Sequence, residues 1–424
     1  MNSDLAKKTG LVLSGGGARG AYQAGVIHYI RTQLPKDISR KINFDILCGS
    51  SVGAVNVCFL AATSHDLEYQ GRMAYELWHS LEQDSIYRRG VGSMTRLAGR
   101  TFSGILKNIF LGVPKTKHED LVYKTHFNGL LDTSPFPLFL NKLIPWQQIR
   151  LNISNATTKA LTITATNVHT GKMELFVEKH KSINYTGRHP AHFVDIEVRH
   201  AVASAAIPIL FPSIRIGRHY YCDGGLRLNT PISPAIQLGA DKILVIGLHH
   251  ISERAKPDEA EEGLIYDIPP TMGEMMGQIL KTIFVDRLDY DVIQLNRINQ
   301  IIDTAEAVYG TDFLYRMNNY LTSGHEQKDI AQRGLKRINV FSIFPSIDVR
   351  QIFNDSLIKS SEIKKYLTTF EKMLLKILDV DLKNGLDFLT FVMFSAPFIN
   401  KLLELGYEDA KKKHNELIEF FGND

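Results

Sequence analysis

Short apolar runs alternate with amphipathic stretches over the first 250 residues of the chain. The apolar runs at 11–13 and 44–48 each lead, through a glycine-containing turn, into a helical pattern, at 21–33 and from Val52 to about Thr63. A strand followed by a helix, repeated along the chain, is typical of a parallel α/β sheet. The start of the chain therefore predicts an α/β core.

The same alternation returns after an interruption. A helical pattern at 66–81 is followed by an irregular, basic stretch that reaches about Pro145. Strands are then expected at 160–168, 172–177, 220–222 and 242–248, with a helix at 196–206. The last strand carries the apolar run ILVIGL, which is typical of a strand buried on both faces. We expect the α/β core to end near His250.

Helical periodicity dominates the remainder of the chain. The polar segment 252–262 predicts a linker or surface loop, and apolar residues at three- and four-residue steps from Met272 predict an amphipathic helix. One strand is expected at 337–343 and helices at 357–378 and 386–405, with the segment 388–400 in the core. The predicted organisation is an α/β domain over 1–250, with a basic cap or insertion at about 85–150, and a mostly helical region over 251–424 that packs on it or caps it.

The composition is that of an ordinary globular protein. Hydrophobic residues make up 44% and charged residues 22% of 424 positions, which excludes disordered, collagen-like and coiled-coil classes. The formal net charge of +4 gives no argument for nucleic-acid binding. Three cysteines, Cys48, Cys58 and Cys222, fit neither a disulfide framework nor a metal site and indicate a reducing compartment. Since no signal-peptide pattern or apolar span of about 20 residues occurs, we expect a cytoplasmic protein.

A glycine-rich loop, GGGARG at 15–20, lies between the first predicted strand and helix. Backbone N–H groups at a helix N-terminus point outward and bind anions. Gly15, Gly17 and Gly20 also have the G-x-G-x-x-G spacing of dinucleotide-binding proteins, with Asp45 as the acidic residue further along the chain. The loop alone therefore leaves a dinucleotide site open.

A serine stands in the setting of a nucleophile elbow. The sequence GSSVG at 49–53 is a G-x-S-x-G motif between a predicted strand and a predicted helix, which would expose the Ser51 hydroxyl. This hydroxyl needs a base, and a tetrahedral oxyanion needs N–H donors. Asp223, followed by Gly224 and Gly225, is the candidate base, and the loop at 15–20 reaches the same edge of the sheet as Ser51.

Together these motifs resemble the patatin-like phospholipase family over about residues 9–250. The matching motifs are G-G-G-x-R-G from Gly15 to Gly20, G-x-S-x-G from Gly49 to Gly53, and D-G-G from Asp223 to Gly225. SAAIP from Ser204 and NTP from Asn229 are also similar to family sequence. The resemblance implies a three-layer α/β sandwich with a mainly parallel central sheet, followed here by a mostly helical C-terminal region.

The resemblance also implies an activity, hydrolysis of fatty-acyl esters of phospholipids or lysophospholipids without a metal or cofactor. Ser51 would attack the ester and Asp223 would act as general base. The oxyanion hole would comprise the backbone around Gly15, Gly16 and Gly17, with Arg19 near the oxyanion or a lipid phosphate. The supporting motif glycines are Gly20, Gly49, Gly53, Gly224 and Gly225.

Three alternatives stay open at this point. A Ser-Asp-His triad would use His249 or His250, which end the strand at 242–248. An acyltransferase would use the same acyl-serine with an acceptor other than water. A dinucleotide-binding oxidoreductase would use the loop at 15–20, although it would give no role to Ser51 or Asp223.

The stretch 85–118 is locally basic. It contains seven Lys or Arg residues and no Asp or Glu, and its apolar residues Phe102, Ile105, Leu106, Ile109 and Phe110 have helical spacing. This pattern predicts peripheral contact with a membrane surface, or else a solvated cap whose apolar face packs inward. No nucleic-acid-binding fold is recognisable, and the sequence does not indicate an oligomeric state.

Overall fold

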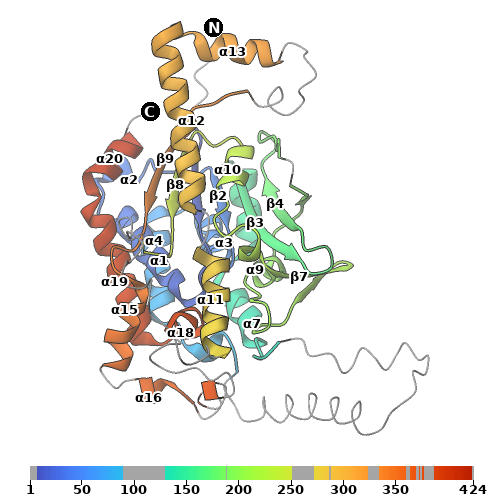
Figure 1. Ribbon diagram of the computed structural model, residues 1–424, viewed down its shortest axis with the longest axis vertical. Helices are drawn as coiled ribbons and strands as arrows, with labels where there is room; N and C mark the ends of the chain where they lie inside the picture. The colour runs from blue at the N-terminus through green and yellow to red at the C-terminus, as the bar shows by residue number, and fades with distance from the viewer. Residues whose placement is uncertain are drawn as a thin grey trace, which may run out of the picture.

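One mixed β-sheet with a parallel centre organises the molecule (Figure 1). The computed structural model describes residues 7–88, 129–187, 189–250, 272–285, 288–322, 334–359, 363–368, 372, 375–376 and 386–422. Within these residues the strand order is β5-β4-β3-β2-β1-β8-β9, and β7 joins β3 to β6. The strands are β1 (Thr9–Leu13), β2 (Ile46–Gly49), β3 (Ala160–Asn167), β4 (Met173–Lys179), β5 (Ala191–Phe193), β6 (Ile214–Ile216), β7 (His219–Asp223), β8 (Lys242–Ile246) and β9 (Asn339–Ile343).

The central strands are parallel from β3 to β9, whereas β4 and β7 pair with β3 in the antiparallel sense. Parallel strands place their carboxyl ends at one edge of the sheet. The turns that follow β1 and β2 therefore lie next to each other, and they carry the glycine-rich loop and Ser51. The mainly parallel α/β fold is confirmed.

Helices cover both faces of the sheet, which makes three layers (Figure 1). Those of the first 250 residues are α1 (Ala21–Thr32), α2 (Lys36–Ser39), α3 (Val52–Ala62), α4 (Leu67–His79), α7 (Pro135–Leu143), α8 (Trp146–Ser154), α9 (Val198–Ser204) and α10 (Ile232–Gln237). The later ones are α11 (Met272–Val285), α12 (Leu288–Tyr309), α13 (Phe313–Thr322), α15 (Val349–Phe353), α16 (Ile363–Tyr366), α18 (Leu386–Val392), α19 (Ala396–Lys412) and α20 (His414–Gly422).

Alternation along β1 shows how the two cores form. Leu11 and Leu13 point into the larger core, which includes α1, α3 and α19, and Val12 points into the smaller core beneath α10. All three side chains are buried. Because successive side chains of a strand face opposite sides, a strand buried on both faces reads as a continuous apolar run.

The C-terminal region contributes to the same sheet. The strand expected at 337–343 is present as β9, and it pairs in parallel with β8. The expected end of the α/β core near His250 was therefore too early. Helix α19 also packs on α1 at close range, since a Cβ on Gly406 would lie 2.1 Å from the carbonyl oxygen of Tyr22. The larger core is thus shared between the two halves of the chain.

Two predictions about the positions of helices were wrong. The single helix expected at 386–405 is two helices, because Ser395 precedes α19 and Pro397 occupies its first turn, where a missing N–H is tolerated. The stretch expected to be irregular up to Pro145 contains α7, whose Phe136 and Leu140 are buried at helical spacing.

Several expectations lie outside the described residues, among them most of the basic stretch 85–118, the loop 252–262 and much of 357–378. In the described part of the chain, every helix is too short or too polar to cross a membrane.

Candidate active site

Ser51 occupies a sharp turn between β2 and α3. Its backbone has φ 53° and ψ −126°, a conformation that L-residues rarely adopt. The turn is possible because its neighbours lack side chains: a Cβ on Gly53 would lie 2.2 Å from the carbonyl oxygen of Leu13. A Cβ on Gly49 would lie 2.4 Å from the carbonyl oxygen of Gly53. The strand-turn-helix setting expected for Ser51 is present.

Asp223 lies at the end of β7 with its carboxylate against Ser51. The Ser51 hydroxyl donates to Asp223 Oδ2 at 2.6 Å, and the Gly225 N–H donates to Oδ1 at 2.8 Å. Both Ser51 and Asp223 are buried, at 1% and 0% exposure. Burial raises the pKa of Asp223 to about 7, against the two hydrogen bonds, which lower it. The structure therefore joins two residues that lie 172 positions apart in sequence.

Gly224, next to Asp223, has no room for a side chain. A Cβ there would lie 2.2 Å from Thr164 Oγ1 on β3. The Thr166 hydroxyl on the same strand donates to the Asp223 carbonyl oxygen at 2.9 Å. The end of β7 is thus held against β3, which fixes the direction of the Asp223 side chain.

A short segment at the C-terminal end of α9, Ser204 to Ala206, forms hydrogen bonds with the backbones of both residues. The Ser51 N–H donates to Ser204 Oγ at 2.9 Å, and the Asp223 N–H donates to the Ala206 carbonyl oxygen at 2.9 Å. The sequence predicted no contact of this segment with Ser51 or Asp223, although SAAIP is similar to family sequence. The same segment therefore holds the backbones of Ser51 and Asp223 next to each other.

The glycine-rich loop lies beside Ser51, since a Cβ on Gly15 would lie 2.7 Å from Ser51 Cβ. The Gly15 N–H is already donated to Asn229, at 3.0 Å to Oδ1 and 3.2 Å to the backbone oxygen. The N–H of Gly15, one of the expected oxyanion donors, is therefore already paired in this structure. Gly16 and Gly17 begin a short 3-10 helix, where N–H groups have no intrahelical acceptor. Their N–H groups have no acceptor within the described residues.

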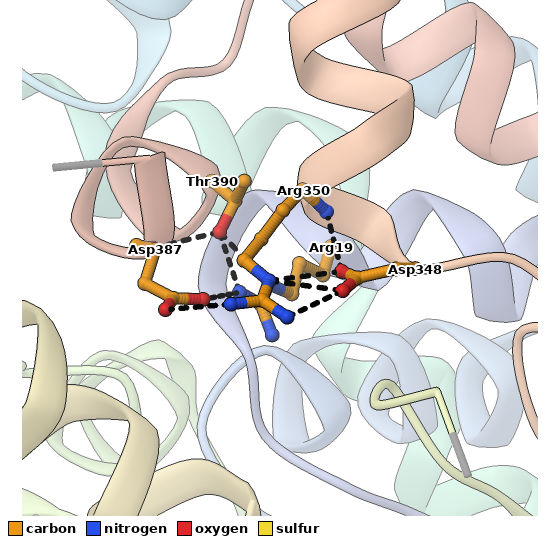
Figure 2. Close-up of polar contacts among 5 residues, drawn as sticks. All are labelled: Arg19, Asp348, Arg350, Asp387 and Thr390. Atoms are coloured by element: carbon orange, nitrogen blue, oxygen red, sulfur yellow. Dashed lines mark hydrogen bonds and ion pairs between the residues drawn. The ribbon is translucent and has the colours of Figure 1, made fainter. Parts of the chain in front are cut away.

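The Arg19 side chain points towards Thr390 and Asp387 on α18 (Figure 2). Its Nε and Nη2 donate to Thr390 Oγ1 at 3.1 and 2.6 Å, and its guanidinium lies 3.9 Å from the centre of the Phe391 ring. The sequence predicted Arg19 near the oxyanion or a lipid phosphate. Its hydrogen bonds instead go to α18. Thr390 and Phe391 lie in a region where the sequence predicted only a core helix.

Ser51 lines an apolar cavity; the space among its lining residues, open solvent included, is about 950 Å³. Helices α1, α3, α4 and α7 form most of its wall, and Gly17 and Phe394 also border it. The few polar side chains in the wall bond to one another: Trp78 Nε1 donates to Asn56 Oδ1 at 3.0 Å, and Asn56 Nδ2 donates to Gln23 Oε1 at 2.8 Å. The cavity therefore suits a long apolar chain.

The alternative site residues have other partners. His250 Nδ1 lies 2.9 Å from the Pro345 carbonyl oxygen, and the His249 ring packs with Phe344. Asp45 precedes β2, at the edge of the sheet opposite to the glycine-rich loop, and forms an ion pair with Lys159 at 2.8 Å. These contacts give no support to a Ser-Asp-His triad or to a dinucleotide site.

Within the described residues, no cluster of three or more His, Cys, Asp or Glu side chains could hold a metal ion.

Sequence comparison places the chain in a known class of protein. A family model described as "Patatin-like phospholipase" matches residues 11–236, which is more than half of the chain. The chain belongs to the patatin-like phospholipase family, as its motifs predicted.

Two curated proteins are similar to this chain over about half of its length. A Pseudomonas aeruginosa protein named "cGAMP-activated phospholipase" is 30% identical over 222 residues, 52% of this chain and 53% of that protein. "Probable lipid hydrolase 463L" of Invertebrate iridescent virus 6 is 25% identical over 238 residues, 54% and 63% of the two chains. The chain thus matches little more than half of these relatives' lengths. A crystal structure of VipD from Legionella pneumophila aligns at a TM-score of 0.31 with 13% identity, covering 97% of this chain and 67% of that one.

Proposed function

We propose that the protein is a serine lipid acyl hydrolase that cleaves fatty-acyl esters of phospholipids or lysophospholipids through a Ser51-Asp223 dyad. The observation that carries the proposal is the 2.6 Å hydrogen bond from the Ser51 hydroxyl to Asp223, where Ser51 lines an apolar cavity. Family membership and the names of the two relatives support the same chemistry.

In the first half-reaction, Ser51 Oγ attacks the ester carbonyl carbon while its proton passes to Asp223 Oδ2. The carbonyl oxygen becomes an oxyanion that accepts hydrogen bonds from the backbone N–H groups of Gly16 and Gly17. When the tetrahedral intermediate collapses, the carbon–oxygen bond to the leaving alcohol breaks, and the alcohol takes the proton from Asp223. The fatty acyl group is then bound to Ser51 as an ester.

In the second half-reaction, Asp223 takes a proton from water and the resulting hydroxide attacks the acyl-serine. Collapse of this intermediate returns a proton to Ser51 and releases the fatty acid. A general base is most effective when its pKa lies near the working pH. The pKa of about 7 that burial gives to Asp223 suits this role.

The cavity wall supports a lipid substrate. Its polar atoms at Gln23 and Asn56 are already paired, so they offer little to a charged head group, whereas the apolar wall suits an acyl chain. The head group would then remain outside the mouth, near the surface of the protein. Helix α7, which forms one wall with Phe136 and Leu140, also carries Leu138, whose side chain is 70% exposed. We propose that this part of the surface, with the basic stretch 85–118, contacts the membrane that holds the substrate.

The proposal is tested by fatty-acid release from vesicles that contain both phospholipid and lysophospholipid, in the presence of a chelator. We expect release by the wild type and loss of activity in Ser51→Ala and Asp223→Asn. Ser64→Ala, a buried serine at the far end of α3, is the matched control and should stay active. Melting temperatures confirm that each variant is folded. Release that persists in folded Ser51→Ala would contradict the proposal, as would a wild type that neither releases fatty acid nor reacts with a fluorophosphonate probe at Ser51.

A further inference from the structure

Helix α18 (Leu386–Val392), near the end of the chain, is in direct contact with the loop that carries the candidate oxyanion donors. A Cβ on Gly17 would lie 2.0 Å from the carbonyl oxygen of Phe391, so the two backbones touch. The φ of Gly17 is +56°, which also favours glycine. The position of the Gly17 N–H therefore depends on where α18 lies.

A side-chain connection reinforces this contact (Figure 2). Arg19, two residues after Gly17, is only 5% exposed. It donates two hydrogen bonds to Thr390 Oγ1, and its Nη2 lies 3.6 Å from Asp387 Oδ1. Burial lowers the pKa of Arg19 to about 10, which leaves the group charged at neutral pH. A buried cation is costly without its partners, so Arg19 ties the loop to α18.

The partners of Arg19 are themselves held in place. The Thr390 hydroxyl donates to the Asp387 carbonyl oxygen at 2.7 Å, which orients its lone pairs towards Arg19. Arg350 on α15 lies 3.7 Å from Asp387 Oδ2 and also pairs with Asp348 at 2.6 Å (Figure 2). The network Arg19, Thr390, Asp387, Arg350 and Asp348 thus extends from the glycine-rich loop to two C-terminal helices.

From this arrangement we infer that Thr390 and Asp387 are positioning residues for ester hydrolysis, which act through Arg19. They hold the loop so that the Gly16 and Gly17 N–H groups keep the geometry that the oxyanion requires. The inference rests on the proposed function. It gives the C-terminal region a part in the reaction although none of its residues needs to touch the reacting atoms. Preorganised donors are effective only when the surrounding structure fixes them, and a displacement of about 1 Å can cost about 10²-fold in rate.

The test compares Thr390→Val, which keeps the shape and loses the hydroxyl, with Thr390→Ser, which retains it. Thr63→Val is the matched control, because Thr63 is equally buried and its hydroxyl bonds only to the Phe59 carbonyl oxygen in its own helix. Each protein is assayed for kcat and KM on lysophospholipid and for thermal stability. Inhibition is measured with a lipid trifluoromethyl ketone, which forms an oxyanion with the serine, and with a non-hydrolysable ether lipid, which does not.

We expect Thr390→Val to lower kcat about 10-fold, less than the 10²- to 10³-fold typical of a lost oxyanion donor. Its affinity for the ketone should fall by a similar factor, while KM and binding of the ether lipid stay unchanged. Thr390→Ser should recover most of the loss, and Thr63→Val should lose stability without loss of kcat. A folded Thr390→Val with wild-type kcat and ketone affinity would overturn the inference and leave the proposed function intact. If the wild type itself shows no Ser51-dependent hydrolysis, both fall.

Discussion

A buried carboxyl group next to a serine hydroxyl is the feature on which the proposed chemistry depends. Asp223 is completely buried, and its two hydrogen-bond donors only partly offset the loss of water. Desolvation favours the neutral acid, so the pKa rises to about 7. This value lies where a base can both accept and release a proton at neutral pH.

The rate should therefore depend on the ionisation of Asp223. Because only the carboxylate can take the Ser51 proton, we expect kcat/KM to rise about tenfold per pH unit below pH 7 and to level off above it. The measurement is hydrolysis of a soluble short-chain ester from about pH 5 to about pH 9, which avoids effects of pH on vesicles. A flat profile through pH 7 would contradict the assignment of Asp223 as base.

The same group should affect stability in the opposite sense. The pKa of Asp223 is about 7 in the folded protein and 3.8 in the reference state, so folding favours the protonated form. The contribution of protonated Asp223 to the free energy of unfolding is therefore complete below about pH 4. It is lost as the pH rises through about 7. We therefore expect Asp223→Asn to gain stability relative to the wild type between about pH 4 and about pH 8, as measured by urea unfolding. A difference that does not change with pH would argue against the raised pKa.

Ser204 should support the turn at Ser51. Ser204→Ala removes the acceptor of the buried Ser51 N–H, and an unpaired buried donor costs about 1–3 kcal/mol. We expect this loss in the free energy of unfolding, together with a lower kcat. Ser64→Ala is the control, since it removes only a 3.1 Å bond within one helical turn. Equal losses in the two variants would mean that the Ser204 bond has no special importance.

Among the helices, α1, α3, α4 and α7 form the cavity beside Ser51, so they determine which substrates fit. Ser51, at the start of α3, lines the cavity together with residues of α1, α3, α4 and α7. Small side chains leave the space open; Ala74 on α4 borders the cavity together with Leu77 and Trp78. The volume is therefore set by side chains that can be exchanged without touching Ser51 or Asp223.

Changes at these positions should alter the preference for acyl-chain length. Ala74→Leu fills part of the cavity, so kcat/KM for long-chain esters should fall about tenfold relative to short-chain esters, and Leu77→Ala should have the opposite effect. Rates on a short-chain ester serve as the internal control for folding and chemistry. If the long-to-short ratio is the same in both variants and the wild type, the cavity does not hold the acyl chain.

At the scale of the whole molecule, the C-terminal region is part of the core. Strand β9 extends the central sheet, and α19 packs on α1 with backbones close enough that Gly25 and Gly406 have no room for a side chain. Phe398, Leu402 and Leu403 on α19 are fully buried. The sheet and its covering helices therefore need residues from both halves of the chain.

A chain that ends after about residue 250 should fail to fold. It would lose β9 and expose the face of α1 that α19 covers, an apolar surface that favours aggregation. We expect this fragment to be insoluble or to lack a cooperative urea transition, whereas the full chain shows one. A soluble fragment with wild-type fatty-acid release would contradict both this prediction and the role inferred for α18.

The parallel α/β core and the candidate residues Ser51 and Asp223 could be predicted from the amino-acid sequence. Both follow from local patterns, because an apolar run, a glycine turn and an amphipathic helix specify a strand, an elbow and a helix within a few residues. Ser51 and Asp223 could be recognised because each has glycine neighbours that only a tight turn requires. Apolar residues continue at helical spacing across the break between α18 and α19. This periodicity therefore predicts a single helix where the structure has two.

Contacts between distant segments could not be predicted in this way, because they form only when the chain folds. Three hydrogen bonds join positions 153, 214 and 371 residues apart. They link Ser51 with Ser204, Gly15 with Asn229, and Arg19 with Thr390. Ser204 and Asn229 lie in segments similar to family sequence, but their bonding partners, like that of Thr390, are set by folding and not by the local pattern. The same holds for the pKa of Asp223, which is a consequence of burial and so exists only in the folded protein.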